Sequence, residues 1–193
     1  MEIRPLSPAL GAEILGVDIA SGLSNAEHDA IVRAYGDYGV IFFRDQRLTP
    51  EQHIAFARRF GEINVNRFFK PVEGYPLIAE VRKEPDQSTN IGGGWHTDHS
   101  YDTTPAMGSI LYAIEVPSVG GDTLFASMYT AWETLSDGMK ALLGDLRAVH
   151  SSRHVFGHSR ALEDPDVGDR LGNPDLAVQD ALHPVVITHP ATG

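Results

Sequence analysis

The residues best suited to chemistry lie in one short stretch, Trp95-His96-Thr97-Asp98-His99. If this stretch is a strand, its alternating side chains place His96 and Asp98 on one face, where both can reach a single metal ion. Imidazole and carboxylate ligands suit Fe(II), and two His with one carboxylate form the facial triad of non-haem iron oxygenases. The spacing alone is weak evidence, because the numbers of His and Asp in the chain give roughly 0.7 His-x-Asp pairs by chance. On spacing alone, ordinary hydrogen bonds within a strand are the favoured interpretation.

Glycines around this stretch strengthen the metal-site hypothesis. Gly92-Gly93-Gly94 comes directly before it and allows a bend and a close approach of the backbone. Some 25 residues further on, Gly120-Gly121-Asp122-Thr123 is typical of a tight turn that opens a strand. The two glycine clusters therefore predict a shaped site rather than an isolated pair of polar residues.

A rival metal site consists of three histidines, His150, His154 and His158. At positions i, i+4 and i+8 they would share one helix face and could bind zinc. Serine and glycine residues between and beside them disfavour a helix, and no nearby carboxylate completes the set. A solvated loop is the competing interpretation of this segment.

Composition excludes several classes of protein. The chain has no Cys, which excludes disulfides, iron–sulfur clusters and thiol catalysis. Its net charge of −11 argues against nucleic acid or anionic lipid as a partner. No apolar stretch approaches the roughly 18 residues of a membrane helix, and the N-terminus lacks the apolar core of a signal peptide. We therefore expect a cytoplasmic protein with no membrane partner.

Two helices are predicted by their N-terminal signals. Ser24 followed by Glu27 fits a capping box, and Gly36 is expected to stop that helix. Thr49 followed by Pro and then Gln52 predicts a second helix in the same way.

The remaining elements are predicted by apolar runs and alternation, and the 193 residues suggest one domain. A further helix is expected over residues 129–143. Strands are expected at residues 12–19, 40–43, 77–81, 95–99, 109–114, 123–126, 146–150 and 185–188. Residues 151–181 are polar and predict a long loop or lid over the site, because loops of this length commonly cover one.

The longer pattern WHTDHSY…P…GSILYA…EVPSVGGDTLFAS resembles the taurine dioxygenase family, which includes oxygenases of sulfonates, alkyl sulfates and phenoxyacetate herbicides. GAEILGVDIA, GVIFFRDQRLTPEQHIAFARRFGEI and HPVVITHPATG extend the resemblance over nearly the whole chain. It implies a mixed, mainly β fold: a double-stranded β-helix, the jelly roll of clavaminate synthase-like proteins, with flanking N-terminal helices. It also implies Fe(II) as cofactor, 2-oxoglutarate as co-substrate, and hydroxylation of a small organic substrate by O2 with release of succinate and CO2.

The resemblance assigns individual roles. His96 and Asp98 match the first two iron ligands, and Thr123 matches the threonine that binds the distal carboxylate of 2-oxoglutarate. The positions expected to contact substrate hold Asn66, Phe69, His99 and Tyr101. Asn66 and Phe69 replace the His and Tyr that hold sulfonate in taurine dioxygenase, which argues against taurine. Phe69 and Tyr101, with Phe68, suggest a larger and more aromatic pocket, and an anionic or aromatic substrate is expected. Plain core packing is the alternative explanation of the aromatic residues.

Two parts of the family's site have no counterpart in these 193 residues. The second iron His and the 2-oxoglutarate Arg lie beyond the segment that matches HPVVITHPATG, so we expect residues 1–193 to be the N-terminal part of one dioxygenase domain, C-terminally truncated. The full-length protein is expected to be a homo-oligomer. The alternative function is an inactive or non-enzymatic jelly-roll fragment that binds a metal or ligand.

Overall fold

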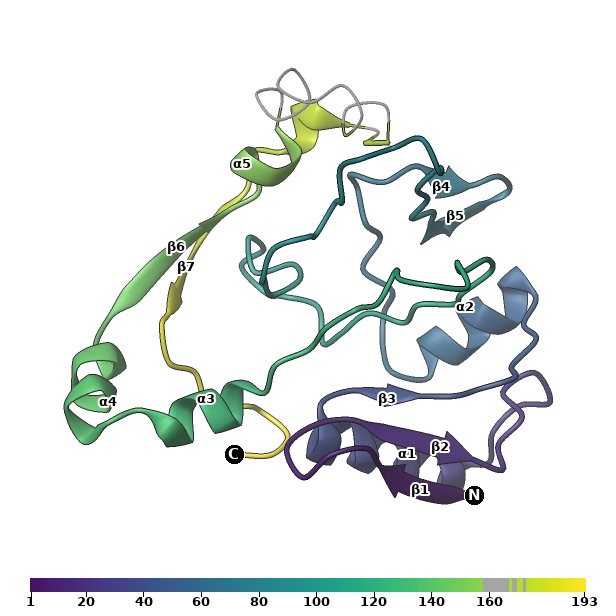
Figure 1. Ribbon diagram of the computed structural model, residues 1–193, viewed down its shortest axis with the longest axis horizontal. Helices are drawn as coiled ribbons and strands as arrows, with labels where there is room; N and C mark the ends of the chain where they lie inside the picture. The colour runs from purple at the N-terminus through teal and green to yellow at the C-terminus, as the bar shows by residue number, and fades with distance from the viewer. Residues whose placement is uncertain (158–166, 168–169, 172) are drawn as a thin grey trace. The chain divides into compact units, whose positions relative to one another are not determined.

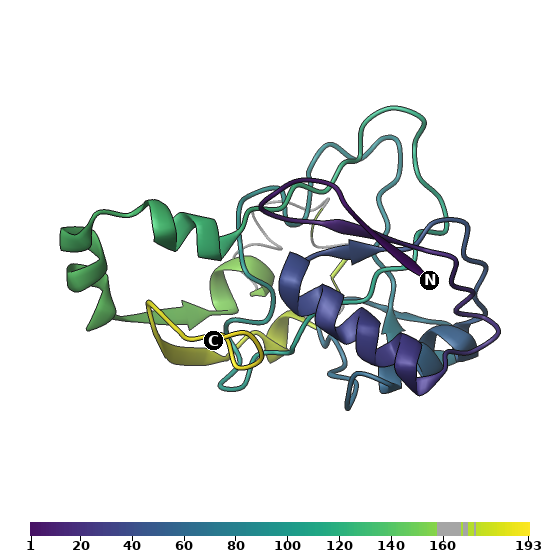
Figure 2. The ribbon, with the colours of Figure 1, turned by 90° about the horizontal axis from the view of Figure 1, so that it is seen from below.

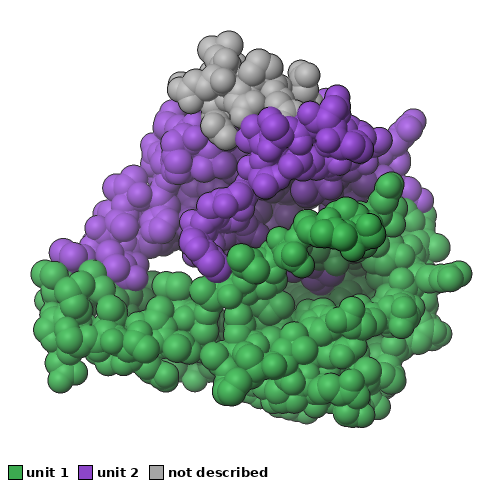
Figure 3. Space-filling model, viewed as in Figure 1, with its two compact units in different colours: residues 1–61, 111–145, 186–193 green, residues 62–110, 146–185 purple. Residues whose placement is uncertain are grey.

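The structure is a computed structural model that describes residues 1–157, 167, 170–171 and 173–193. The chain divides into two compact units, which Figure 3 colours separately. Unit 1 contains residues 1–61, 111–145 and 186–193, and unit 2 contains residues 62–110 and 146–185. Among the described residues, no helix has the length and apolar character needed to cross a membrane.

Helix α1 (Asn25–Tyr38) begins where the sequence predicts. The Ser24 hydroxyl accepts a hydrogen bond from the Glu27 backbone N–H (3.2 Å), and the Glu27 carboxylate accepts one from the Ser24 N–H (2.9 Å). The prediction that Gly36 stops the helix is wrong, because one glycine inside a helix costs only about 1 kcal/mol relative to alanine. The helix instead ends at Gly39, whose φ of 68° suits glycine.

A three-stranded sheet and α1 form the core of unit 1. Strands β1 (Glu2–Pro5) and β2 (Ala12–Leu15) are antiparallel, whereas β2 and β3 (Ile41–Phe42) are parallel and joined by α1. Helix α1 lies against this sheet in both ribbon views (Figures 1 and 2). The strands predicted at 12–19 and 40–43 are therefore present but shorter. The buried centre between helix and sheet consists of Ile14, Ile31 and Ala34.

Helix α2 (Pro50–Arg58) also follows its local signals. Thr49 and Gln52 form a second capping box, and Pro occupies the first turn, where its missing N–H has no helical partner to lose. The buried Phe56 packs edge-on against the rings of Phe43 and Phe60, which holds α2 to the rest of unit 1.

The single helix predicted over residues 129–143 is two helices, α3 (Met128–Thr134) and α4 (Asp137–Gly144). Leu135 is extended, with ψ of 144°, and Ser136 caps α4 by accepting a hydrogen bond from the Met139 N–H. A serine that binds the backbone in this way competes with helix continuation, which explains the break.

Among the described residues, unit 2 contains two antiparallel strand pairs and two short helices. Its elements are β4 (Pro71–Val72), β5 (Tyr75–Ala79), β6 (Arg147–Ser151), α5 (Arg153–Phe156), η1 (Pro174–Leu176) and β7 (Asp180–Pro184). The strand predicted at 77–81 is β5, and that at 146–150 is β6. The strand predicted at 185–188 is wrong, because β6 pairs with β7 from Ser151↔Asp180 to Arg147↔Pro184 and the chain leaves the ladder at Val185. The predicted loop 151–181 holds α5, η1 and the start of β7, and residues 158–166, 168–169 and 172 lie outside the described residues.

The strands predicted at 95–99, 109–114 and 123–126 are not formed. Their apolar side chains stay exposed, with Leu111 at 75% and Ile114 at 85% of full accessibility. A strand needs a neighbour for its backbone hydrogen bonds, and no described residue pairs with these segments. The described residues thus form three small sheets, and the complete jelly roll remains a prediction.

Candidate metal centre

The structure brings His96 and Asp98 together without a strand. His96 lies in an irregular segment and Asp98 begins a turn, yet His96 Nε2 and Asp98 Oδ1 are 3.1 Å apart. Both side chains are more than half exposed, at 53% and 60%. The pair is therefore open to an ion or ligand from solvent.

Hydrogen bonding decides which nitrogen of His96 faces the aspartate. His96 Nδ1 lies 2.8 Å from the carbonyl oxygen of Gly94, which can only accept, so in the neutral form of the ring the proton is on Nδ1. The lone pair of Nε2 then faces the carboxylate oxygen of Asp98. Two acceptor atoms at this distance repel each other unless a cation or a second proton lies between them.

This arrangement fits a divalent metal ion. Two ligand atoms about 2.1 Å from an ion and at a right angle are about 3.0 Å apart, close to the separation seen here. A backbone carbonyl that holds the far nitrogen of a ligating imidazole is a common feature of metal sites. Neutral imidazole and carboxylate are also the donor set that Fe(II) accepts.

Two further residues shape the pair. The Ser109 hydroxyl donates to Asp98 Oδ2 at 3.1 Å, which leaves Oδ1 directed at His96. Gly92 has φ of 78°, and a Cβ there would lie 3.3 Å from His96 Cε1. The expectation of a close backbone approach at the glycine run is confirmed at Gly92.

The described residues supply two ligands and not three. No cluster of three or more His, Asp or Glu side chains with metal-binding geometry occurs in the part of the chain that the structure describes. A helical zinc face is wrong for His150 and His154, because His150 belongs to β6 and His154 to α5. His158 lies outside the described residues.

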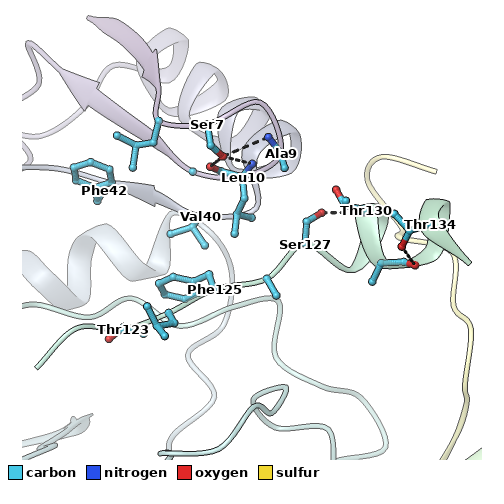
Figure 4. Close-up of a pocket in the computed structure, with 15 residues that line it drawn as sticks. Ser7, Ala9, Leu10, Val40, Phe42, Thr123, Phe125, Ser127, Thr130 and Thr134 are labelled. Carbon is cyan, nitrogen blue, oxygen red and sulfur yellow. Dashed lines mark hydrogen bonds between the residues drawn. The ribbon is translucent and has the colours of Figure 1, made fainter.

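Thr123 lies in unit 1, whereas His96 and Asp98 lie in unit 2. It lines a mainly apolar hollow of about 750 Å³ between the β1–β2 connection, β3 and the segment that leads into α3 (Figure 4). The other walls include Leu10, Val40, Phe42, Phe125 and Thr130. The role of Thr123 toward 2-oxoglutarate stays a prediction.

The aromatic residues near the motif form a packed cluster. Phe68 is 1% exposed, stacks on Phe156 with ring centroids 4.2 Å apart, and meets the ring of Tyr101 edge-on. Burial, reinforced by the negative charge of Asp102, raises the pKa of the Tyr101 hydroxyl to about 12. Phe69 lies at the rim of this cluster, half-buried and edge-on to Phe156. Phe68 and Tyr101 therefore belong to a buried aromatic cluster in this structure.

Asn66 and His99 make local contacts. Asn66 Oδ1 accepts hydrogen bonds from the backbone N–H groups of Phe68 (2.9 Å) and Phe69 (3.2 Å), which turns the chain into the aromatic cluster. His99 Nδ1 lies 3.4 Å from Asp102 Oδ2. Their assignment to substrate stays a prediction.

Three residues of the site were missed from the sequence. Arg67 pairs with Asp102 across 35 residues and Ser109 pairs with Asp98 across 11, distances that no short pattern reveals, whereas Asp102 lies only 3 residues from its partner His99. The sequence could have pointed to Asp102 through its negative charge and its position four residues after Asp98.

Residues 2–193 match the model of the family described as "Taurine catabolism dioxygenase TauD, TfdA family". The chain belongs to this family. It is 35% identical to an (S)-phenoxypropionate/alpha-ketoglutarate-dioxygenase of Sphingobium herbicidovorans, covering 100% of the chain and 68% of that relative. It is 32% identical to an alkylsulfatase of Acinetobacter baylyi, covering 100% and 61%.

A solved structure of a family member supports the same fold. A taurine dioxygenase from Burkholderia xenovorans matches with a TM-score of 0.78 and 32% identity, over 100% of the chain and 60% of that structure. The chain thus spans roughly two thirds or less of these relatives. Its general fold is that of the TauD-type dioxygenases.

Proposed function

We propose that the whole protein is an Fe(II)- and 2-oxoglutarate-dependent dioxygenase that hydroxylates a C–H bond of a small organic substrate. The observation that carries this proposal is the His96–Asp98 pair, with its 3.1 Å separation and its oriented imidazole. Membership of the TauD family supports the choice of metal and co-substrate. Bound Fe(II) would activate O2, which is the oxidant: one oxygen atom would hydroxylate the substrate, and the other would oxidise 2-oxoglutarate to succinate and CO2.

Each residue of the pair has a separate task in this proposal. His96 offers a neutral nitrogen whose direction is fixed by Gly94, and Asp98 offers an anionic oxygen whose direction is fixed by Ser109. Asp98 also argues for hydroxylation, because family members that halogenate lack a carboxylate at this place. Thr123 donates a hydrogen bond to the distal carboxylate of 2-oxoglutarate.

The substrate is proposed to be a small organic anion. Relatives named for (S)-phenoxypropionate and for alkyl sulfate act on compounds that combine an acid group with an apolar body. In the whole protein Asn66, Phe69, His99 and Tyr101 face or support that substrate, residues 151–181 cover it, and the strands close into a jelly roll. The active form is a homo-oligomer.

A binding test of the 193-residue chain examines the metal site directly. Mn(II), a paramagnetic divalent ion, is titrated against labelled protein while the ring signals of all nine His are followed by NMR. We expect the His96 signals to broaden at the lowest Mn(II) concentration, and Asp98→Ala to abolish this preference. Asp86→Ala, which removes an exposed carboxylate of the same unit, is the matched control. Uniform broadening of all His signals in the wild type would contradict the proposal.

The second candidate function is metal or ligand binding without turnover. It is favoured by one observation, the two-ligand composition of the centre among the described residues. The test of this second candidate is succinate release from the 193-residue chain with Fe(II), 2-oxoglutarate and ascorbate. Release at the rate of a complete relative would contradict this second candidate.

A further inference from the structure

The turn that follows the metal-binding motif has an unusual backbone. His99 has φ of 55°, in the left-handed region that residues with a side chain seldom adopt. This residue comes directly after Asp98. Its backbone angles therefore set the path of the chain as it leaves the motif.

Asp102 is the residue that holds this conformation. Its backbone N–H donates to the His99 carbonyl at 3.0 Å, and its carboxylate Oδ2 accepts from His99 Nδ1 at 3.4 Å. Its own carbonyl accepts from His183 Nε2 at 3.0 Å, which ties the turn to strand β7. The side chains of Asp102 and His99 are only 13% and 11% exposed, so these contacts are sheltered from water.

Arg67 fixes Asp102 from the other side. Its guanidinium lies 2.5 Å from Asp102 Oδ1 and 5.7 Å from the centre of the Phe68 ring. The backbone of Arg67 is held in turn, because its carbonyl accepts a hydrogen bond from Asn173 (3.0 Å). The Arg67–Asp102 pair thus joins the turn to the buried aromatic cluster of unit 2.

We propose that Asp102, fixed by Arg67, is a positioning residue that directs the Asp98 carboxylate at His96 by keeping His99 in the left-handed conformation. This inference rests on the proposed function, since it takes His96 and Asp98 as metal ligands. Asp102 does not touch the metal in this scheme. The sequence predicted that a strand would hold the two ligands on one face; in this scheme the turn held by Asp102 does so.

The test uses the 193-residue chain and four variants. Asp102→Ala removes the carboxylate, and Asp102→Asn keeps its shape and one acceptor. The double variant Asp102→Ala/His99→Gly removes the carboxylate but places glycine, which adopts positive φ easily, at the strained position. Asp180→Ala is the matched control, because Asp180 lies in the same unit and its carboxylate pairs with Arg153 (3.1 Å) instead of with His99 or Arg67.

Two quantities are measured on each protein. The first is the Mn(II) concentration that half-broadens the His96 ring signals, and the second is the proton–proton NOE between His96 Hε1 and the Asp98 methylene. We expect Asp102→Ala to raise the half-broadening Mn(II) concentration by about 10- to 100-fold, as is usual when a supporting residue of a metal site is lost. The same variant should lose the NOE between His96 and Asp98. The double variant should recover both in large part, Asp102→Asn should be intermediate, and Asp180→Ala should match the wild type.

The outcomes separate this inference from the proposed function. If the wild type shows no preferred broadening of His96, the metal assignment fails, while the NOE still decides whether Asp102 positions the pair. If Asp102→Ala keeps the wild-type NOE and Mn(II) response, the positioning role is wrong. It is also wrong if the double variant is no better than Asp102→Ala, because the loss would then not act through residue 99. If Asp102→Ala does not fold, Asp102→Asn decides by the same two measurements.

Discussion

Gly92 offers the sharpest test of how the backbone shapes the metal centre. Its φ of 78° costs an L-residue about 1–2 kcal/mol. An alanine Cβ would also lie 3.3 Å from His96 Cε1, so the imidazole would have to move by a few tenths of an ångström. Because His96 is more than half exposed, this segment can rearrange without unfolding the unit.

The expected effect of Gly92→Ala is therefore on binding more than on stability. If the whole strain is relieved by displacing His96, 1–2 kcal/mol corresponds to about a 5- to 30-fold weaker Mn(II) response of the His96 signals. The melting temperature should change little. The assay is the Mn(II) titration with NMR detection, accompanied by thermal unfolding.

Gly74→Ala is the matched control for this substitution. Gly74 has nearly the same φ, 77°, but nothing lies within 4 Å of the place where its Cβ would be. It should cost stability in the β4–β5 hairpin and leave the Mn(II) response of His96 unchanged. Equal weakening by both variants, or no weakening by Gly92→Ala, would refute the argument that the glycine makes room for His96.

Three further predictions concern the core, the pH dependence and the co-substrate. Phe68→Ala should lower the free energy of unfolding by about 3–5 kcal/mol in urea titrations, because it removes a fully buried ring stacked on Phe156. The pKa of Tyr101 is raised to about 12 in the folded chain, so its contribution to stability is complete below pH 10 and is lost as the pH rises toward 12. In urea titrations, the free energy of unfolding of Tyr101→Phe should therefore fall less between pH 10 and 12 than that of the wild type. An equal fall of the unfolding free energy in both proteins would contradict this prediction. In the whole protein Thr123→Ala should weaken 2-oxoglutarate binding by about 10- to 150-fold, which is the contribution of one hydrogen bond to a charged group. Asp98→Ala should abolish metal binding. Calorimetric titration of 2-oxoglutarate and of the metal ion checks both predictions.

Local signals in the sequence were sufficient for two helices. The capping boxes at Ser24 and Thr49 are complete within four residues, and both helices begin where these signals predict. Helix caps can be predicted from the sequence because the residues that form them are close together in the chain. The His96–Asp98 pair was likewise predictable as a candidate, since the residue types and the family resemblance point to metal binding.

The tertiary structure decided how that pair is held. Strand alternation was the expected device, but a strand needs a neighbour, and among the described residues none pairs with 95–99. The pair instead depends on a left-handed turn at His99, which Asp102 and Arg67 hold from 3 and 32 residues away. Sequence determines which side chains can bind a metal and where helices start, because those properties are local. Contacts between distant segments set the direction of the ligands, and only the folded chain reveals them.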